Sequence, residues 1–129
     1  IAIAIDVTFS MDLPGEKGDV KLGSGAALTV MDGSAIAHSG LLKELECICE
    51  KQDIPYQLEV DTAGGTDSGE LRKVDAGVMN LTISIRSRYM HSHRLIIHRK
   101  DYVQTVEAIA ELCRRLDWDK YRALDQQFR

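Results

Sequence analysis

A strand covered on both faces is the first element that this sequence predicts, and it limits the folds that the chain can adopt. Residues 1–8, IAIAIDVT, are almost wholly apolar, with isoleucine at every second position at the start. Short apolar runs rich in β-branched residues are typical of sheets that carry helices on both sides. Ile1 lies inside this run with no methionine or polar lead before it, so we expect the sequence to begin within a larger fold.

Strands and helices are expected to alternate over the rest of the chain. The segment 10–25 contains a proline and several glycines and is predicted to be a loop. Apolar residues at helical spacing predict a helix over residues 39–52, and Asp67 with Glu70 has the spacing of a capping box for a short helix. The other expected elements are strands over 26–32, 54–61 and 78–85, a long helix marked by Val103 to Leu116 and capped by Asp101 with Gln104, and a last short helix with Trp118, Tyr121 and Leu124.

This alternation predicts one α/β domain in which a mostly parallel or mixed central sheet is flanked by helices. The 129 residues are 44 % hydrophobic, which is enough for one core. The net charge of −4 makes a general affinity for nucleic acid or for an anionic membrane unexpected, and no apolar run approaches a membrane-spanning length. The three cysteines, Cys47, Cys49 and Cys113, predict reduced core thiols in a cytoplasmic protein.

Polar residues are expected to gather at one edge of this sheet, because ligands of open α/β sheets bind beyond the carboxyl ends of the strands. Asp6 interrupts the first strand near its carboxyl end, the segment DTAGGTD (61–67) follows the third strand, and RSRYMHSH (86–93) follows the fourth. If these strands are parallel, all three features lie on the same edge. A buried Asp6 carboxylate needs a partner, which can be a metal ion, an arginine or backbone N–H groups.

His91 and His93 alternate along an extended segment, so both imidazoles can lie on one side. Imidazole and carboxylate together suit zinc or cobalt. The alternative is that both are ordinary surface histidines, because a single His-x-His pattern is only a weak indication of a metal site. His38 and His98 stand apart from other ligand-type residues, and we expect them to be solvated.

The glycine turn and the arginines after the fourth strand are candidates for substrate binding. Backbone N–H groups of residues 64–67, at the start of a helix, would favour an anion such as a substrate carboxylate. The alternative is a tight turn in which Thr66 or Asp67 caps the helix. Arg86 and Arg88 could receive a carboxylate, but Arg88 could equally be the structural partner of a buried acid.

Five motifs, in this order and at this spacing, closely resemble the tetrahedral (TET-type) dinuclear aminopeptidases of metallopeptidase family 42, which include glutamyl and deblocking aminopeptidases. They are AIDVTFSMDLPG, VMDGSAI, IPYQLEV, GGTDSG and SRYMHS, and together they extend over nearly the whole chain. The resemblance implies part of a zinc-aminopeptidase fold of the phosphorylase/hydrolase-like type. It also implies a peptidase that removes N-terminal residues from peptides with two divalent ions, zinc or cobalt.

The same resemblance assigns roles to individual residues. Asp6, in the D-V-T motif, corresponds to a ligand of one ion, and His91, in R-Y-x-H-S, corresponds to a ligand of the other. His93 corresponds to no ligand. Two neighbouring ions suit the reaction, because one can polarise the scissile carbonyl while both acidify the attacking water. The family's loop near the substrate corresponds to Gly64, Gly65, Thr66 and Asp67.

Other catalytic parts of this family are expected outside these residues. The remaining ligands are a histidine of an H-x-D motif, a bridging aspartate and the second glutamate of a Glu-Glu pair, whose first glutamate is the general base. Neither H-x-D nor Glu-Glu occurs in residues 1–129. We therefore expect these residues to be the C-terminal portion of a catalytic domain, without its N-terminal portion and inserted β-rich domain. Alone, this portion should bind metal poorly, catalyse nothing and expose a sheet edge. The resemblance also implies assembly into dodecamers for whole members of the family.

Two alternatives stay open at this point. Some relatives carry an endoglucanase label, but a glycosidase needs two carboxylates flanking the scissile bond, and the sequence nominates no such pair. A metal-free binding or assembly module would have kept the fold and lost the chemistry. The presence of both Asp6 and His91 argues mildly against such a module.

Overall fold

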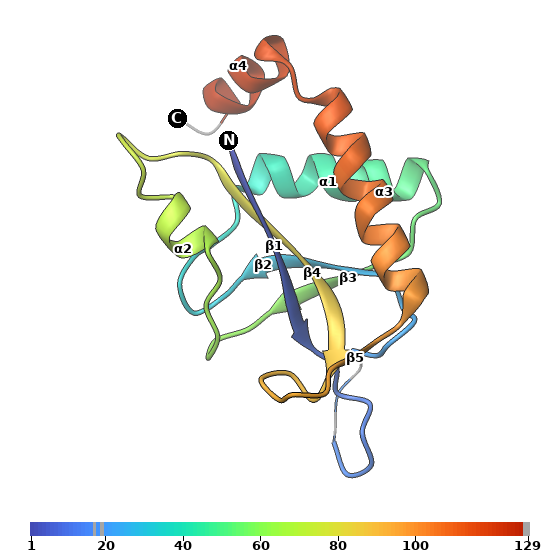
Figure 1. Ribbon diagram of the computed structural model, residues 1–129. Coiled ribbons are helices and arrows are strands. Elements are labelled where there is room, and N and C mark those ends of the chain that lie inside the picture. The colour runs from blue at the N-terminus through green and yellow to red at the C-terminus, as the bar shows by residue number, and fades with distance from the viewer. Residues whose placement is uncertain (17, 19, 128–129) are drawn as a thin grey trace.

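The structure is a computed structural model that describes residues 1–16, 18 and 20–127. Residues 17 and 19, which belong to the predicted loop, lie outside the described part, as do 128 and 129. Figure 1 shows a sheet with two long helices crossing on one side and a short helix beside it. None of the helices in the described ranges is long and apolar enough to span a membrane.

The predicted strands and helices form in the predicted order. The strands are β1 (Ala2–Phe9), β2 (Ala26–Met31), β3 (Tyr56–Val60) and β4 (Asn80–Arg88), joined by a two-residue strand that the sequence did not predict, β5 (Ile96–Ile97). The helices are α1 (Ser39–Lys51), α2 (Ser68–Leu71), α3 (Arg99–Arg115) and α4 (Trp118–Gln127). The predicted α/β class is therefore confirmed.

The sheet is mixed, and this corrects the expectation of a single functional edge. Its strand order is β1-β4-β2-β3, with β5 paired to β4. β1 runs parallel to β4 and β2 runs parallel to β3, but β2 runs antiparallel to β4. The carboxyl end of β3 therefore points opposite to those of β1 and β4. Local patterns could not show this, because the long connections 10–25 and 61–79 can return the chain to either edge.

One face of the sheet carries the hydrophobic core. Leu28 of β2 and Leu81 and Ile83 of β4 are fully buried there. The helices contribute Leu41, Leu45, Ile48, Ala108 and Leu112. Each large apolar side chain buried in this way contributes about 1.5–3 kcal/mol, so this face fixes the helices to the sheet. The other face is polar, because side chains alternate along β4 and its remaining positions are Asn80, Thr82, Ser84, Arg86 and Arg88.

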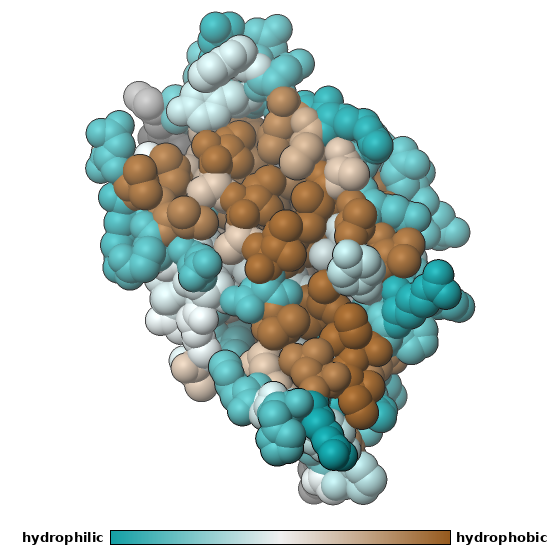
Figure 2. Space-filling view, viewed as in Figure 1, coloured by the Kyte–Doolittle hydropathy of each residue, from teal (hydrophilic) through white to brown (hydrophobic). Residues whose placement is uncertain are grey.

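Several apolar residues are less buried than the sequence predicts. β1 lies at an edge of the sheet, and α3 packs over β2 and β4. Ile5 of β1 is consequently 62 % exposed and Phe9 is 44 % exposed, so the prediction of a strand buried on both faces is wrong for the described chain. Figure 2 shows hydrophobic side chains gathered over β1, along the middle of the side of the molecule that faces the viewer. Cys49 is buried as predicted, but Cys113 is exposed.

The helix caps also differ from those predicted. His38 and His98, which we expected to be solvated, precede α1 and α3, and the Nδ1 atom of each accepts a hydrogen bond from a backbone N–H of the first turn. Asp101, which we expected to cap α3, is fully buried. Its carboxylate accepts hydrogen bonds from the N–H groups of Gly23 and Gly25 at 2.7 and 3.0 Å, and this fixes the end of the loop 10–25 to α3.

Candidate functional site

A cavity of about 210 Å³ on the polar face brings together most of the residues that the sequence singled out. Asp6 of β1, His91 of the loop after β4, and Gly64, Gly65 and Thr66 of the loop after β3 all line it. Asp67 and Arg88 do not line it. The loops after β3 and β4 meet here although they leave opposite edges of the sheet, because the outer strands curl toward each other on this face. The additional lining residues that matter below are Thr8, Thr29, Asp32, Glu59 and Asp61.

Asp6 faces this cavity because side chains alternate along β1. It is half-buried and lies beside Ser84 of β4 in the strand register. Its Oδ1 accepts a hydrogen bond from the N–H of Val7 at 2.7 Å. An ionised carboxylate has about four acceptor sites, so Asp6 keeps acceptor capacity for a metal ion or a substrate.

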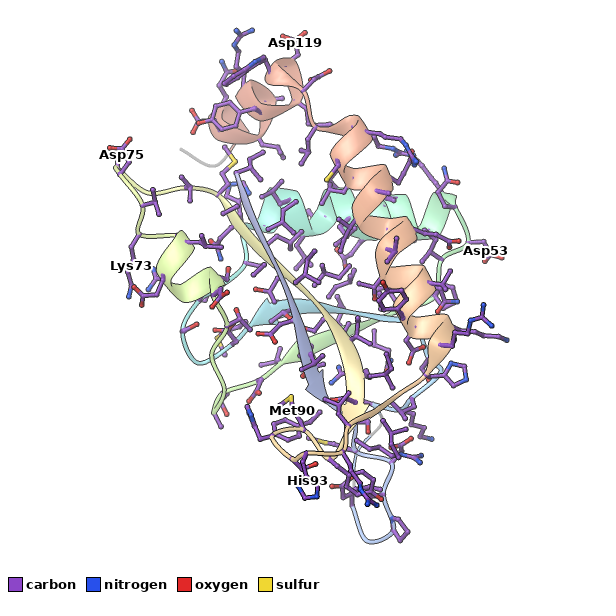
Figure 3. The ribbon with its side chains drawn as sticks, viewed as in Figure 1. Asp53, Lys73, Asp75, Met90, His93 and Asp119 are labelled. Carbon is purple, nitrogen blue, oxygen red and sulfur yellow. The ribbon has the colours of Figure 1, made fainter. Side chains whose placement is uncertain are left out.

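The loop that carries His91 is built on two unusual backbone conformations. Tyr89 and His91 have φ angles of 60° and 61°, in the left-handed region that non-glycine residues rarely occupy. The hydroxyl of Ser92 donates to the carbonyl of Tyr89 at 2.6 Å, and the His91 ring meets the Phe9 ring edge-on, with centroids 6.3 Å apart. Both histidines are exposed, but His93 lies at the outer side of this loop in Figure 3. The two histidines therefore have different surroundings, and only His91 lines the cavity.

Asp32, at the end of β2, holds the glycine loop in place. Its carboxylate accepts hydrogen bonds from the N–H and hydroxyl of Ser34, from the N–H of Ala35 and from the hydroxyl of Thr66, all at 2.7–2.8 Å. Burial by itself would raise the pKa of Asp32, but these hydrogen bonds outweigh burial and lower it. Asp32 is therefore ionised and fixes Thr66 at the cavity.

Two of the backbone N–H groups that the sequence suggested for anion binding, those of Gly64 and Thr66, have partners inside the protein. The N–H of Gly64 donates to Asp61 at 3.3 Å, and the N–H of Thr66 donates to the hydroxyl of Ser34 at 3.3 Å. Both donors are thus already used within the protein. Asp67 precedes α2, but its side chain makes no capping hydrogen bond and its backbone is helical, so the predicted capping box is wrong. Glu70, its expected partner, pairs with Lys73 instead.

Arg88 is held by a half-buried acid, Asp12, and so has the structural role that was the second of the two possibilities left open by the sequence. Its Nε and Nη2 atoms donate to the two carboxylate oxygens of Asp12 at 2.9 and 2.7 Å. Such fork-shaped pairs are strong and geometrically specific. The hydrogen bond from Arg88 holds the pKa of Asp12 far below its usual range. The pair fixes the loop after β1 to the end of β4.

Glu59 of β3 connects all four long strands, and the sequence pattern gave it no role. Its buried carboxylate accepts hydrogen bonds from the hydroxyls of Thr8 in β1 and Thr29 in β2 and from Nη1 of Arg86 in β4. β1 and β3 are the outer strands of the sheet order, so the contact between Thr8 and Glu59 shows how far the sheet curls. This network forms the floor of the cavity, two residues along β1 from Asp6.

Arg86 is more deeply buried than Glu59, and only some of its donors have partners. Nη1 donates to Glu59 at 3.0 Å and to the carbonyl of Phe9 at 2.7 Å. Its Nε and Nη2 atoms are buried without a hydrogen-bond partner within the described ranges. Unsatisfied buried donors are costly, so the attraction of Glu59 is needed to keep this cation inside the protein.

The donor types around the cavity fit a divalent ion, but their number does not complete a site. Asp6 supplies a carboxylate and His91 an imidazole, the mixture that zinc and cobalt accept. No group of three or more histidine, cysteine, aspartate or glutamate side chains is arranged to hold a metal within residues 1–16, 18 and 20–127. Asp32 and Glu59 are committed to hydrogen bonds inside the protein.

The missed residues do carry a signal in the sequence. Polar residues at every second position of NLTISIRSR mark one face of β4, and Gln57, Glu59 and Asp61 mark one face of the strand predicted over 54–61. The period of two identifies polar faces, but it does not reveal that the two outer strands curl until Thr8 reaches Glu59.

The fold defined above is that of an aminopeptidase domain. The aminopeptidase from the archaeon Desulfurococcus kamchatkensis has a solved structure that matches 96 % of this chain and 36 % of its own, with a TM-score of 0.92 and 33 % sequence identity. A family model, described as M42 glutamyl aminopeptidase, matches residues 1–108, and the chain therefore belongs to this family.

Further similarities agree with this assignment. A protein of Acetivibrio thermocellus whose name describes an aminopeptidase is 39 % identical over 112 residues, covering 86 % of this chain and 34 % of that protein. The TET1 peptidase of Pyrococcus horikoshii, which can assemble into a tetrahedron or a large octahedral shell, is 31 % identical, with a TM-score of 0.64 over 84 % of this chain and 32 % of its own. A Thermotoga maritima structure named endoglucanase is 26 % identical, with a TM-score of 0.61 over 83 % of this chain and 31 % of its own. The chain thus spans about a third of the length of the relatives that it matches.

Proposed function

We propose that this chain is the C-terminal portion of the catalytic domain of a metal-dependent aminopeptidase that removes N-terminal residues from peptides. Family membership over residues 1–108 supports the aminopeptidase class. The observation that carries the proposal is the convergence of Asp6, His91 and the loop 64–66 on one cavity.

Within this proposal, Asp6 and His91 each supply one ligand, to different divalent ions, zinc or cobalt. The two ions, when bound, would polarise the scissile carbonyl and activate a water molecule. Asp32 holds Thr66, and with it the loop of Gly64 and Gly65, against the space where the peptide would lie. The general base and the remaining ligands come from a different part of the protein, so residues 1–129 alone are expected to be inactive.

A chimaera tests this function. The matched 36 % of the Desulfurococcus kamchatkensis aminopeptidase is replaced by this chain, and release of N-terminal residues from short peptides is measured with zinc or cobalt. We expect the chimaera to be active, and Asp6→Asn and His91→Gln each to lower kcat about 100-fold or more, because a lost ligand removes metal-ion catalysis. His93→Gln is the matched control and should change kcat less than about twofold, since His91 lines the cavity and His93 does not.

Two results would contradict the proposal. Full activity of His91→Gln would show that His91 is not a metal ligand. A chimaera that is folded but inactive with every metal would favour a binding or assembly module. Hydrolysis of oligosaccharides would favour a glycosidase, but no observation supports this, because Glu59 and Asp32 are both held by hydrogen bonds inside the protein.

The setting of the whole protein forms part of the same proposal. We infer a cytoplasmic homo-oligomer, a dodecamer as in the tetrahedral members of the family, acting on peptides. The exposed apolar residues of β1 support a further covering segment or subunit over this edge.

A further inference from the structure

A second and larger cavity adjoins the first. It has a volume of about 570 Å³ and lies between the carboxyl ends of β1 and β3 and the loop that follows β1. Both cavities are lined by Thr8, Phe9, Glu59, Asp61, Gly64 and His91. A ligand that passes His91 from the cavity of Asp6 therefore enters the larger cavity. Its volume falls within the range of small-molecule pockets, about 300–1,000 Å³.

The wall of the larger cavity is mainly apolar. It contains Phe9, Met11, Val20, Leu58, Val60 and Ala63. Five of these six residues are exposed, all but Val20, with Leu58 exposed by 50 % and Val60 by 63 %. Exposed apolar side chains that surround a concave surface next to a candidate catalytic site are typical of a ligand pocket for an apolar group.

Charges in this cavity oppose an acidic ligand. Among the described residues that line this cavity, Arg86 is the one with a permanent positive charge. Glu59 already pairs with it at 3.0 Å. The Nε and Nη2 atoms of Arg86 are buried, so they present no donor surface to the cavity. Asp61 stands at the junction of the two cavities, where its Oδ1 accepts the N–H groups of Ala63 and Gly64. A carboxylate entering here would meet the charge of Asp61 and no unpaired arginine.

We propose that the larger cavity binds the side chain of the peptide's N-terminal residue, and that it selects large apolar side chains over acidic ones. This inference rests on the proposed aminopeptidase function and adds the substrate class. The apolar wall removes a leucine-sized side chain from water, whereas an acidic side chain loses hydration and meets the charge of Asp61.

The test uses the 129-residue chain and small amides that stand in for an N-terminal residue. Leucinamide and the α-amide of glutamate are titrated into ¹⁵N-labelled protein, and the backbone amide shifts are followed by NMR. We expect leucinamide to shift signals of Phe9, Leu58, Val60 and Ala63. It should bind at least about ten times more tightly than the glutamate amide, the difference expected from burying one large apolar side chain.

A single substitution should reverse the preference. Ala63 is exposed, and its N–H bond to Asp61 does not depend on its side chain, so Ala63→Arg adds a cation to the wall with little effect on folding. We expect this variant to bind the glutamate amide more tightly than leucinamide. Ala76→Arg, an exposed site outside the cavity, is the matched control and should keep the original order.

The inference is overturned if the ratio of affinities is below ten, if leucinamide shifts signals elsewhere, or if Ala63→Arg leaves the order unchanged. This titration needs no metal and no turnover. An inactive chimaera with normal titrations would therefore contradict the proposed function alone, and an active chimaera without this selectivity would contradict the pocket alone.

Discussion

Breaking the pair between Glu59 and Arg86 should destabilise the chain far more than removing both partners. The two side chains are 8 % and 3 % exposed, so water screens their charges little. At the observed 3.0 Å, unit charges attract by about 5 kcal/mol at an effective dielectric constant of about 20. We therefore expect Glu59→Leu, which leaves Arg86 buried and uncompensated, and Arg86→Met, which leaves Glu59 buried, each to cost about 3–5 kcal/mol.

The double variant distinguishes the pair from ordinary packing. Leucine and methionine together fill a similar volume without a charge, so the double variant should lose at least about 2 kcal/mol less than the sum of the single losses. Equilibrium urea unfolding followed by circular dichroism measures these differences. The exposed pair Glu70 and Lys73 is the matched control, in which Glu70→Gln and Lys73→Met should show no measurable coupling. Additive losses at Glu59 and Arg86, within about 0.5 kcal/mol, would refute the reasoning.

Three further predictions follow from individual contacts. Asp32→Ala should cost about 2–4 kcal/mol in urea unfolding and accelerate hydrogen exchange at Thr66, because four hydrogen bonds are lost, while Asp119→Ala at an exposed helix start should change neither. The pKa of Asp12 is lowered in the folded state by Arg88, so the stabilisation is complete above the usual carboxyl pKa of about 3.9 and is lost as pH falls below it. The melting temperature, measured from pH 6 to pH 2, should therefore fall less steeply in Arg88→Gln than in the native chain. Equal slopes would exclude the pair as a source of acid sensitivity. Burial raises the pKa of the Cys49 thiol to about 11, so a thiol reagent at pH 8 should label exposed Cys113 rapidly and Cys49 only after urea is added, and rapid labelling of Cys49 would show that the core opens easily.

The fold could be predicted from the sequence wherever a local pattern carried the information. Apolar spacing placed the helix over 39–52 within one residue of α1, and the four long strands were all found. The direction of β2 relative to β4 could not be predicted, because it depends on contacts across the sheet rather than on periodicity. β5 has only two residues and therefore no period to detect.

The candidate site was predictable in part. Asp6, His91 and the loop 64–66 were identified by position and motif, and the structure places them on one cavity. Their metal and substrate roles remain predictions. Glu59 was missed because a glutamate in an edge strand normally faces water, and only the curl of the sheet buries it. His98 is exposed as predicted and His38 is half-buried, but the capping role of both was missed, because it depends on backbone direction at the helix start.

The left-handed backbone at Tyr89 and His91 has a consequence for anyone who redesigns this chain. Glycine or asparagine occupies such φ angles at lower cost than tyrosine or histidine, so either substitution would relieve local strain. A sequence optimised for folding stability alone would therefore discard both side chains. That loss would remove the imidazole beside the cavity, although the melting temperature of the molecule would rise. Stability screens of this family should therefore hold these two positions fixed.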